Sequence, residues 1–252
     1  MKMRAIISLI PSVLLFVLLM GSCYGYGFIP SKREVENEVA QTVENEEYEL
    51  DRVEKIRTRP REKVYHYKSK ERDMEFTATS ALIPQYTFFF QFKYYERYVY
   101  TDYVQSVRSF YYDDTLDILT SSPYFDDSMS ITDRYLSANE YYLKIKNYAE
   151  LQDAAQTVYE VSQLYSNEQQ YNSESWVTKN PLIELSVIWD SQNEEKTYRD
   201  IILYSFHITG MEEEDSILHE LEIKYAEWIK EGRIPEDEMV PDSIMKQVYE
   251  ED

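Results

Sequence analysis

The chain has 252 residues, with 26 Lys and Arg against 47 Asp and Glu, and a formal net charge of −21. This acidic balance argues against nucleic acid as a partner, because the phosphate backbone repels a polyanion. Only five glycines and one cysteine occur, which excludes glycine-rich phosphate loops and any intramolecular disulfide. No nucleotide or other cofactor is expected, and 43% apolar residues are enough for a folded core rather than a disordered tail.

The first residues have the order of a secretory signal. Lys2 and Arg4 give a positive start, residues 5–20 carry no charge and are mainly apolar, and the small pair Gly21-Ser22 follows. The apolar run has 16 residues and contains two serines and a proline, whereas a membrane span needs about 20 apolar residues. The segment is therefore predicted to direct export.

The residues Leu19-Met20-Gly21-Ser22-Cys23 resemble the lipobox of bacterial lipoproteins. The resemblance implies that residues 1–22 are removed as a signal peptide and that Cys23, the only cysteine, is lipidated and becomes the first mature residue. Two acyl chains give durable attachment to a membrane. The alternatives are a cleaved signal with an incidental cysteine and an uncleaved N-terminal anchor.

Residues 23–62 are predicted to form a charged, flexible tether behind this anchor. Glu, Lys and Arg dominate from Lys32 to Arg61, where Tyr48 is the only aromatic residue. Such a composition favours a solvated linker. Apolar residues recur there at roughly helical spacing, so a thin stalk helix is the alternative.

From residue 63 to residue 252 the pattern indicates a single α+β domain. Lys63–Lys68 and Met74–Leu82 are predicted strands around a polar turn. Tyr86 to Tyr112 then holds 13 Tyr and Phe in 27 positions, and every even position from 86 to 94 is aromatic. The alternation favours a strand, although some aromatic residues also fit a helical spacing.

Four tyrosines of this stretch form the candidate binding surface. Tyrosine combines apolar area with a polar tip, so it suits half-buried strands and binding surfaces alike. A tyrosine-lined face is able to stack on a glycan or to receive a protein strand at a sheet edge. A core strand is the alternative interpretation. The candidates are Tyr95, Tyr98, Tyr100 and Tyr103.

Residues 113–133 are predicted to be a polar loop or insertion. The loop holds the pairs Asp113/Asp114 and Asp126/Asp127, which are candidates for acid–base chemistry or calcium binding. A calcium loop needs alternating oxygen ligands and a glycine at its sharp turn, and this segment has no glycine. The pairs are predicted to be solvated, and no metal site is expected.

The remaining chain has the clearest periodicity. Strands are predicted over 140–146, 183–189 and 197–208, and amphipathic helices follow the first and the last of them. Their apolar faces must be buried against each other. The predicted fold is an antiparallel sheet with both helices packed on one face, and a ferredoxin-like arrangement without its last strand is one form of it.

Catalytic motifs are missing from the sequence. His219-Glu220 begins like a zinc-protease helix, but position 223 is Ile rather than His, and no serine lies in a nucleophile elbow. We therefore expect a non-enzymatic lipoprotein that presents an acidic domain to a protein or glycan partner on the extracytoplasmic side of the cell membrane. The alternative is a cell-envelope hydrolase that uses paired carboxylates.

Overall fold

The structure is a computed structural model that describes residues 28–59, 61–86, 93–130, 139–180, 182–190, 202–237 and 239–250. Across these residues the fold is α+β, which confirms the predicted class. The chain divides into two compact units, Met1–Tyr103 and Val104–Asp252. The boundary falls inside the range that was expected to form one domain.

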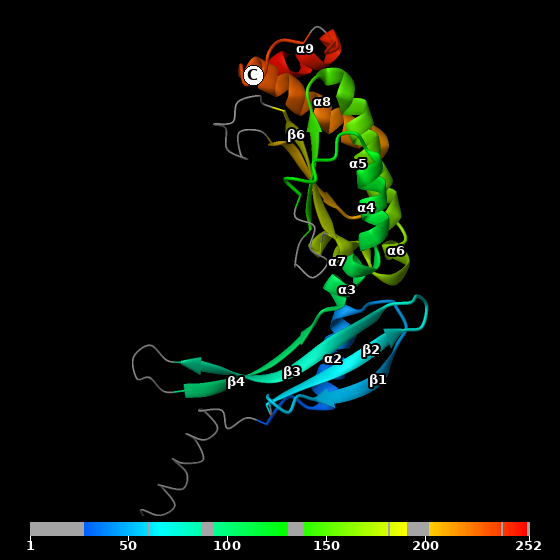
Figure 1. The fold of residues 1–252 in the computed structure, drawn as a ribbon, viewed down its shortest axis with the longest axis vertical. Helices are drawn as coiled ribbons and strands as arrows, with labels where there is room; N and C mark the ends of the chain where they lie inside the picture. The colour runs from blue at the N-terminus through cyan, green and yellow to red at the C-terminus, as the bar shows by residue number, and fades with distance from the viewer. Residues whose placement is uncertain are drawn as a thin grey trace, which may run out of the picture. The chain divides into compact units, whose positions relative to one another are not determined.

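Unit 1 is built on a four-stranded antiparallel sheet with strand order β1-β2-β3-β4 (Figure 1). Each strand pairs with the next one in the sequence. The strands predicted around residues 63–68 and 74–82 are confirmed. The aromatic stretch is a strand over Lys93–Thr101, as predicted, but it is helical over Tyr103–Phe110. The alternating run over 87–92 lies outside the described residues. The elements are α2 (Lys32–Thr42), β1 (Tyr48–Lys55), β2 (Glu62–Ser69), β3 (Glu75–Tyr86) and β4 (Lys93–Thr101).

The segment predicted to be a flexible tether contains α2 and β1, so this prediction needs correction. Ser31 caps α2 with a capping box, in which the Glu34 N–H donates to Ser31 Oγ and the Ser31 N–H donates to the Glu34 carboxylate at 2.8 Å. Val35 and Val39 are fully buried on the sheet side of this helix. Capping and this short apolar stripe are enough to order the charged segment.

Unit 2 contains a three-stranded sheet with strand order β5-β6-β7. It is mixed, so the predicted antiparallel pairing holds for the sheet of unit 1 but not throughout this one. β5 runs parallel to β6, and β6 runs antiparallel to β7. α3 (Tyr103–Phe110) begins at the last residue of unit 1. The other elements are α4 (Tyr112–Ser121), β5 (Glu140–Ile145), η1 (Tyr148–Glu150), α5 (Leu151–Tyr165), α6 (Glu168–Tyr171), α7 (Glu174–Lys179), β6 (Ile183–Trp189), β7 (Ile202–Ile208), α8 (Glu214–Lys230) and α9 (Asp242–Glu250).

The two amphipathic helices predicted after residue 140 are α5 and α8, and Figure 1 shows them together beside this sheet. Their buried stripes include Val158 and Val161 on α5 and Leu221 and Tyr225 on α8. The topology is not ferredoxin-like, because that split arrangement places a strand between the two parallel strands. Here β5 and β6 are direct neighbours.

The predicted loop over 113–133 is largely ordered. Its first part is α4, where Thr115 and Leu119 are fully buried. A short segment then runs beside β5, where the Asp126 N–H donates to the Tyr142 carbonyl at 2.8 Å and the Lys144 N–H donates to the Tyr124 carbonyl at 2.7 Å. Residues 131–138 lie outside the described residues.

The two units differ strongly in charge. Unit 1 has 15 Lys and Arg and 15 Asp and Glu, whereas unit 2 has 11 and 32. The formal net charge of −21 therefore belongs entirely to unit 2. The unit nearest the predicted anchor is close to neutral.

Candidate binding site

The two faces of the unit 1 sheet have different surroundings. Residues opposite one another in neighbouring strands point to the same face, so the register places Tyr65, Tyr67, Phe76 and Ala78 together. All four are buried, and the Tyr67 and Phe76 rings stack with centroids 5.3 Å apart. This face forms the core with α2, which leaves the opposite face available for recognition.

Tyr98 and Tyr100 lie on that opposite face, side by side on β4. Their side chains are 45% and 42% exposed, and their ring centroids are 5.5 Å apart at an angle of 37°. They stand opposite Ala81 and Thr79 of β3, two small and buried residues. We call the pair Tyr98 and Tyr100 the tyrosine patch.

The other two candidate tyrosines lie elsewhere. Tyr95 is on the opposite face of β4, where the Arg61 guanidinium lies 3.8 Å from the centre of its ring. Tyr103 is fully buried at the start of α3, and its hydroxyl donates to Glu46 and accepts from Arg72. Tyr103 is therefore part of the packing and not of a surface.

The strand that carries the tyrosine patch is an edge strand. The Asp102 N–H donates to the Thr77 carbonyl of β3 at 3.0 Å. Because ladder hydrogen bonds alternate with a period of two residues, the N–H groups of Tyr98 and Tyr100 point toward β3. Those of Arg97 and Val99 point away from the sheet, where they are able to pair with another strand.

The two edges of this sheet are protected to different degrees. Proteins discourage strand pairing at an edge with charged side chains and with bulges. Five of the eight residues of β1 are charged, and its register shifts between Leu50 and Arg52. β4 keeps an unbroken register, and residues 98–101 carry no charge. Of the two, β4 is the edge better suited to accept a further strand.

A polar rim lies on the open face of the sheet toward β1. Arg52 and Glu54 flank His66, whose ring nitrogens lie 3.3 Å from a guanidinium nitrogen and 3.3 Å from a carboxylate oxygen respectively. The pairing of Glu54 with Val64, and of Val64 with Thr79, continues this face to Tyr100. Charged and hydrogen-bonding groups thus lie on the same face as the tyrosine patch, at the other side of the sheet, and polar groups of this kind form the rim of protein interfaces.

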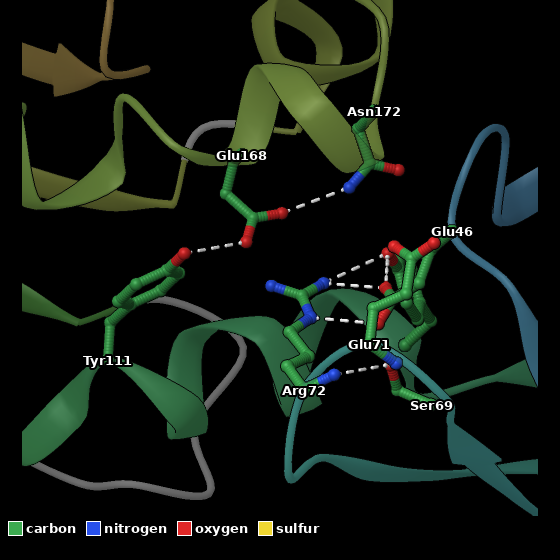
Figure 2. A network of polar contacts seen from close by, with 8 residues as sticks. Glu46, Ser69, Glu71, Arg72, Tyr111, Glu168 and Asn172 are labelled. Carbon is green, nitrogen blue, oxygen red and sulfur yellow. Dashed lines mark hydrogen bonds and ion pairs between the residues drawn. The ribbon is translucent and has the colours of Figure 1, made fainter.

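A buried ion pair links two segments of unit 1. Figure 2 shows the Arg72 guanidinium directed at the Glu46 carboxylate, with Nε and Nη2 donating at 2.8 and 2.6 Å. The side chains are 4% and 0% exposed. Ser69 Oγ accepts from the N–H groups of Glu71 and Arg72, both at 3.2 Å. The network joins the segment before β1 to the turn between β2 and β3.

Unit 2 has a separate buried carboxylate network. Glu168 is fully buried and accepts from the Tyr111 hydroxyl at 2.9 Å and from the Asn172 amide at 3.0 Å, as Figure 2 also shows. The Tyr111 bond ties the junction of α3 and α4 to α6, and the Asn172 bond closes the end of α6. Buried polar groups with such partners stabilise a specific packing, and their inaccessibility argues for a structural role.

The carboxylate and histidine candidates do not assemble into a site. Asp113 and Asp114 lie exposed in the first turn of α4, and Asp126 accepts from two N–H groups of its own turn. Among the residues that the structure describes, no group of three His, Cys, Asp or Glu is placed to hold a metal ion.

Cys23 lies outside the described residues. No helix of the described ranges is long and apolar enough to cross a membrane. Neither a protein-family model, nor a curated protein, nor a solved structure matches this chain significantly.

Proposed function

We propose that the protein is a bacterial lipoprotein of the cell membrane that binds a partner protein without catalysing a reaction. Acyl chains on Cys23 hold it on the extracytoplasmic side. Support for the anchor comes from the lipobox-like residues 19–23. Without residues 1–22, which carry Lys2 and Arg4, unit 1 has 13 basic and 15 acidic residues and a net charge of only −2. An anionic membrane surface therefore repels it little.

The observation that carries the binding role is the outer edge of β4. An extended peptide adds to such an edge through main-chain hydrogen bonds, and side-chain pockets or patches supply specificity. The outward N–H groups of Arg97 and Val99 provide the main-chain donors. The tyrosine patch contacts alternate side chains of the added strand, in keeping with the enrichment of tyrosine at interfaces.

The binding role is tested by pull-down from membranes with the intact chain and three variants. Val99→Pro removes an outward donor while the ladder to β3 remains, and Val99→Ala removes the side chain but keeps the donor. Tyr98→Ser/Tyr100→Ser removes the patch. Compared with wild type, the recovery of a specific partner should be at least about fivefold lower with the proline variant, which is the loss expected for one net hydrogen bond. The recovery with the patch variant should also be lower than with wild type.

Two controls make the result decisive. Val53→Ala removes an exposed apolar side chain from β1, the other edge of the same sheet, and should leave recovery unchanged. Circular dichroism confirms that each variant is folded. Equal recovery with wild type, Val99→Pro and the patch variant would refute strand addition at β4.

A glycan partner is the competing outcome. Sedimentation with purified cell-wall glycan measures it directly, because aromatic rings stack on sugars without using the strand edge. Co-sedimentation that is lost in the patch variant but kept in Val99→Pro would replace the protein partner by a glycan.

The anchor is tested separately. The Cys23→Ser chain should leave the membrane fraction, and mass spectrometry of the wild-type chain should find an acylated Cys23 at its N-terminus. A bare thiol or a retained leader would contradict the lipoprotein assignment without affecting the binding test.

A further inference from the structure

A hollow of about 330 Å³ lies in unit 2 between β7 and the first turns of α8. Its walls combine two aromatic rings, two aliphatic side chains and acidic groups. We call it the β7–α8 hollow. The residues used below are Tyr204, Phe206, Met211, Ile217, Glu213 and Glu220.

The aromatic wall comes from alternate positions of β7. Tyr204 and Phe206 are two residues apart on one strand, so their side chains share a face. Their ring centroids are 4.6 Å apart at an angle of 53°. Both rings line the hollow, where Tyr204 is half-buried and Phe206 is 8% exposed, so a group that enters contacts aromatic carbon on this wall.

The charge of the hollow is entirely negative. Glu213 and Glu220 are exposed at its rim, and no Lys, Arg or His is among the described residues that line it. A hydrogen bond to Glu220 raises the pKa of Tyr204, so its ring stays neutral and does not repel the carboxylates. An anionic ligand is disfavoured on every side.

Glu212 adds a fixed charge at the base of the hollow. Its carboxylate accepts from the N–H groups of Thr209, Gly210 and Met211 and from the hydroxyls of Thr209 and Ser162, at 2.6 to 3.1 Å. All these donors are neutral, so they position the carboxylate and leave its charge in place. The surrounding unit also carries the whole net charge of the chain.

We propose that the β7–α8 hollow binds an organic ammonium group. Aromatic faces attract such cations through their quadrupole, and the rim carboxylates add Coulomb attraction. The volume is at the lower end of the range for ligand pockets, so the group that enters is the size of a head group or a side chain. The hollow favours an alkylated ammonium, whose methyl groups also contact Met211 and Ile217.

Calorimetric titration of the full chain with choline tests this proposal. The comparison is its neutral isostere, 3,3-dimethylbutan-1-ol, which has the same shape without the charge. Choline should bind and the alcohol should bind at least about threefold more weakly, the lower limit for a cation–π contact. Blocked lysine, Nα-acetyl-lysine amide, is a second probe for a protein side chain.

Three variants locate the binding. Phe206→Leu keeps the apolar wall without the ring and should weaken choline binding about threefold to tenfold. Glu213→Gln/Glu220→Gln should weaken it by about threefold or more. Glu214→Gln removes a carboxylate from the same turn outside the hollow and should change the affinity less than twofold.

The outcomes separate the sources of the ligand. Binding of choline without blocked lysine supports a small molecule or lipid head group, and binding of both also supports a side chain of a partner protein. Binding of blocked lysine alone would contradict the preference for an alkylated ammonium. Equal binding of the alcohol, unchanged affinity in the folded Phe206 and glutamate variants, or no binding of either cation would overturn the proposal. None of these results depends on the β4 edge.

Discussion

At the residue scale, the buried pair Glu46–Arg72 is the most demanding polar feature of unit 1. Removing two charges from water costs several kcal/mol per ion, which the pair recovers only with good geometry and further hydrogen bonds. The two guanidinium bonds and the Tyr103 hydroxyl supply both. Loss of one partner should therefore cost far more than loss of an exposed pair.

Glu46→Gln should lower the free energy of unfolding by about 3 kcal/mol, because it leaves a buried guanidinium without its counter-charge. Urea unfolding of the full chain measures the change, and hydrogen exchange of β2 and β3 assigns it to unit 1. Glu47→Gln is the control. Glu47 pairs with Lys70 at 3.3 Å while 69% exposed, and its loss should cost less than about 1 kcal/mol. Equal costs would contradict the importance of burial.

The same pair makes unit 1 sensitive to acid. Burial raises the pKa of Glu46, but the hydrogen bonds from Arg72, Ser69 and Tyr103 outweigh it and lower the pKa below the ordinary 4.5. A lowered folded pKa means that the ionised group stabilises the fold above the unfolded pKa. That contribution disappears as the pH falls through the folded pKa, so the stability difference between wild type and Glu46→Gln should shrink there.

At the element scale, the sequence correctly predicted helices and strands whose apolar residues follow a clear periodicity. The apolar stripes of α5 and α8 and the alternation in β5 and β6 gave correct helices and strands. α2 had an equally local signal, because Ser31 and Glu34 have the spacing of a capping box, but the density of charge around it favoured a linker. The helical spacing of Leu50, Val53 and Ile56 concealed β1, which is set by pairing with β2.

The site was predictable only in part, because a sequence pattern shows the alternation along one strand but not how separate elements pack. Tyr98 and Tyr100 follow the alternation of one strand and are exposed together. The alternation ends at Asp102, whose carboxylate accepts from the N–H and hydroxyl of Thr77, and Tyr103 then starts a helix and turns inward. The β7–α8 hollow had no sequence signal, because it depends on how a strand packs beside a helix.

Two glycines with positive φ offer a matched test of packing between elements. Gly210 has φ +82°, and a Cβ there would lie 2.5 Å from the carbonyl carbon of Tyr165 at the end of α5, whereas Gly232 has φ +69° and open space. Gly232→Ala should cost about 1 kcal/mol for the left-handed backbone alone. Gly210→Ala adds a backbone clash and should cost more than about 3 kcal/mol. Thermal unfolding compares them, and similar losses would argue against close packing at Gly210.

At the scale of the whole molecule, charge is divided unequally. Unit 1 balances 15 basic with 15 acidic residues, and unit 2 sets 11 against 32. A compact body with a large net charge is destabilised by its own repulsion. Unit 2 therefore folds against an electrostatic cost that unit 1 does not have. The same charge gives unit 2 a negative potential that attracts cations and repels polyanions.

Salt should stabilise unit 2 selectively, because counter-ions screen repulsion between exposed charges over a Debye length of about 10 Å at 0.1 M and about 3 Å at 1 M. Hydrogen exchange of the full chain at low and at high sodium chloride measures both units in one sample. Protection of the amides in β5, β6 and α5 should increase with salt, while that of β2 and β3 changes little. Unit 1 is thus the internal control for general salting-out of apolar surface, which would protect both units. A loss of protection in unit 2 would show that ion pairs such as Lys144–Asp190, at 3.3 Å, outweigh the net repulsion, and a parallel increase in both units would show general salting-out instead. Either result would contradict the prediction.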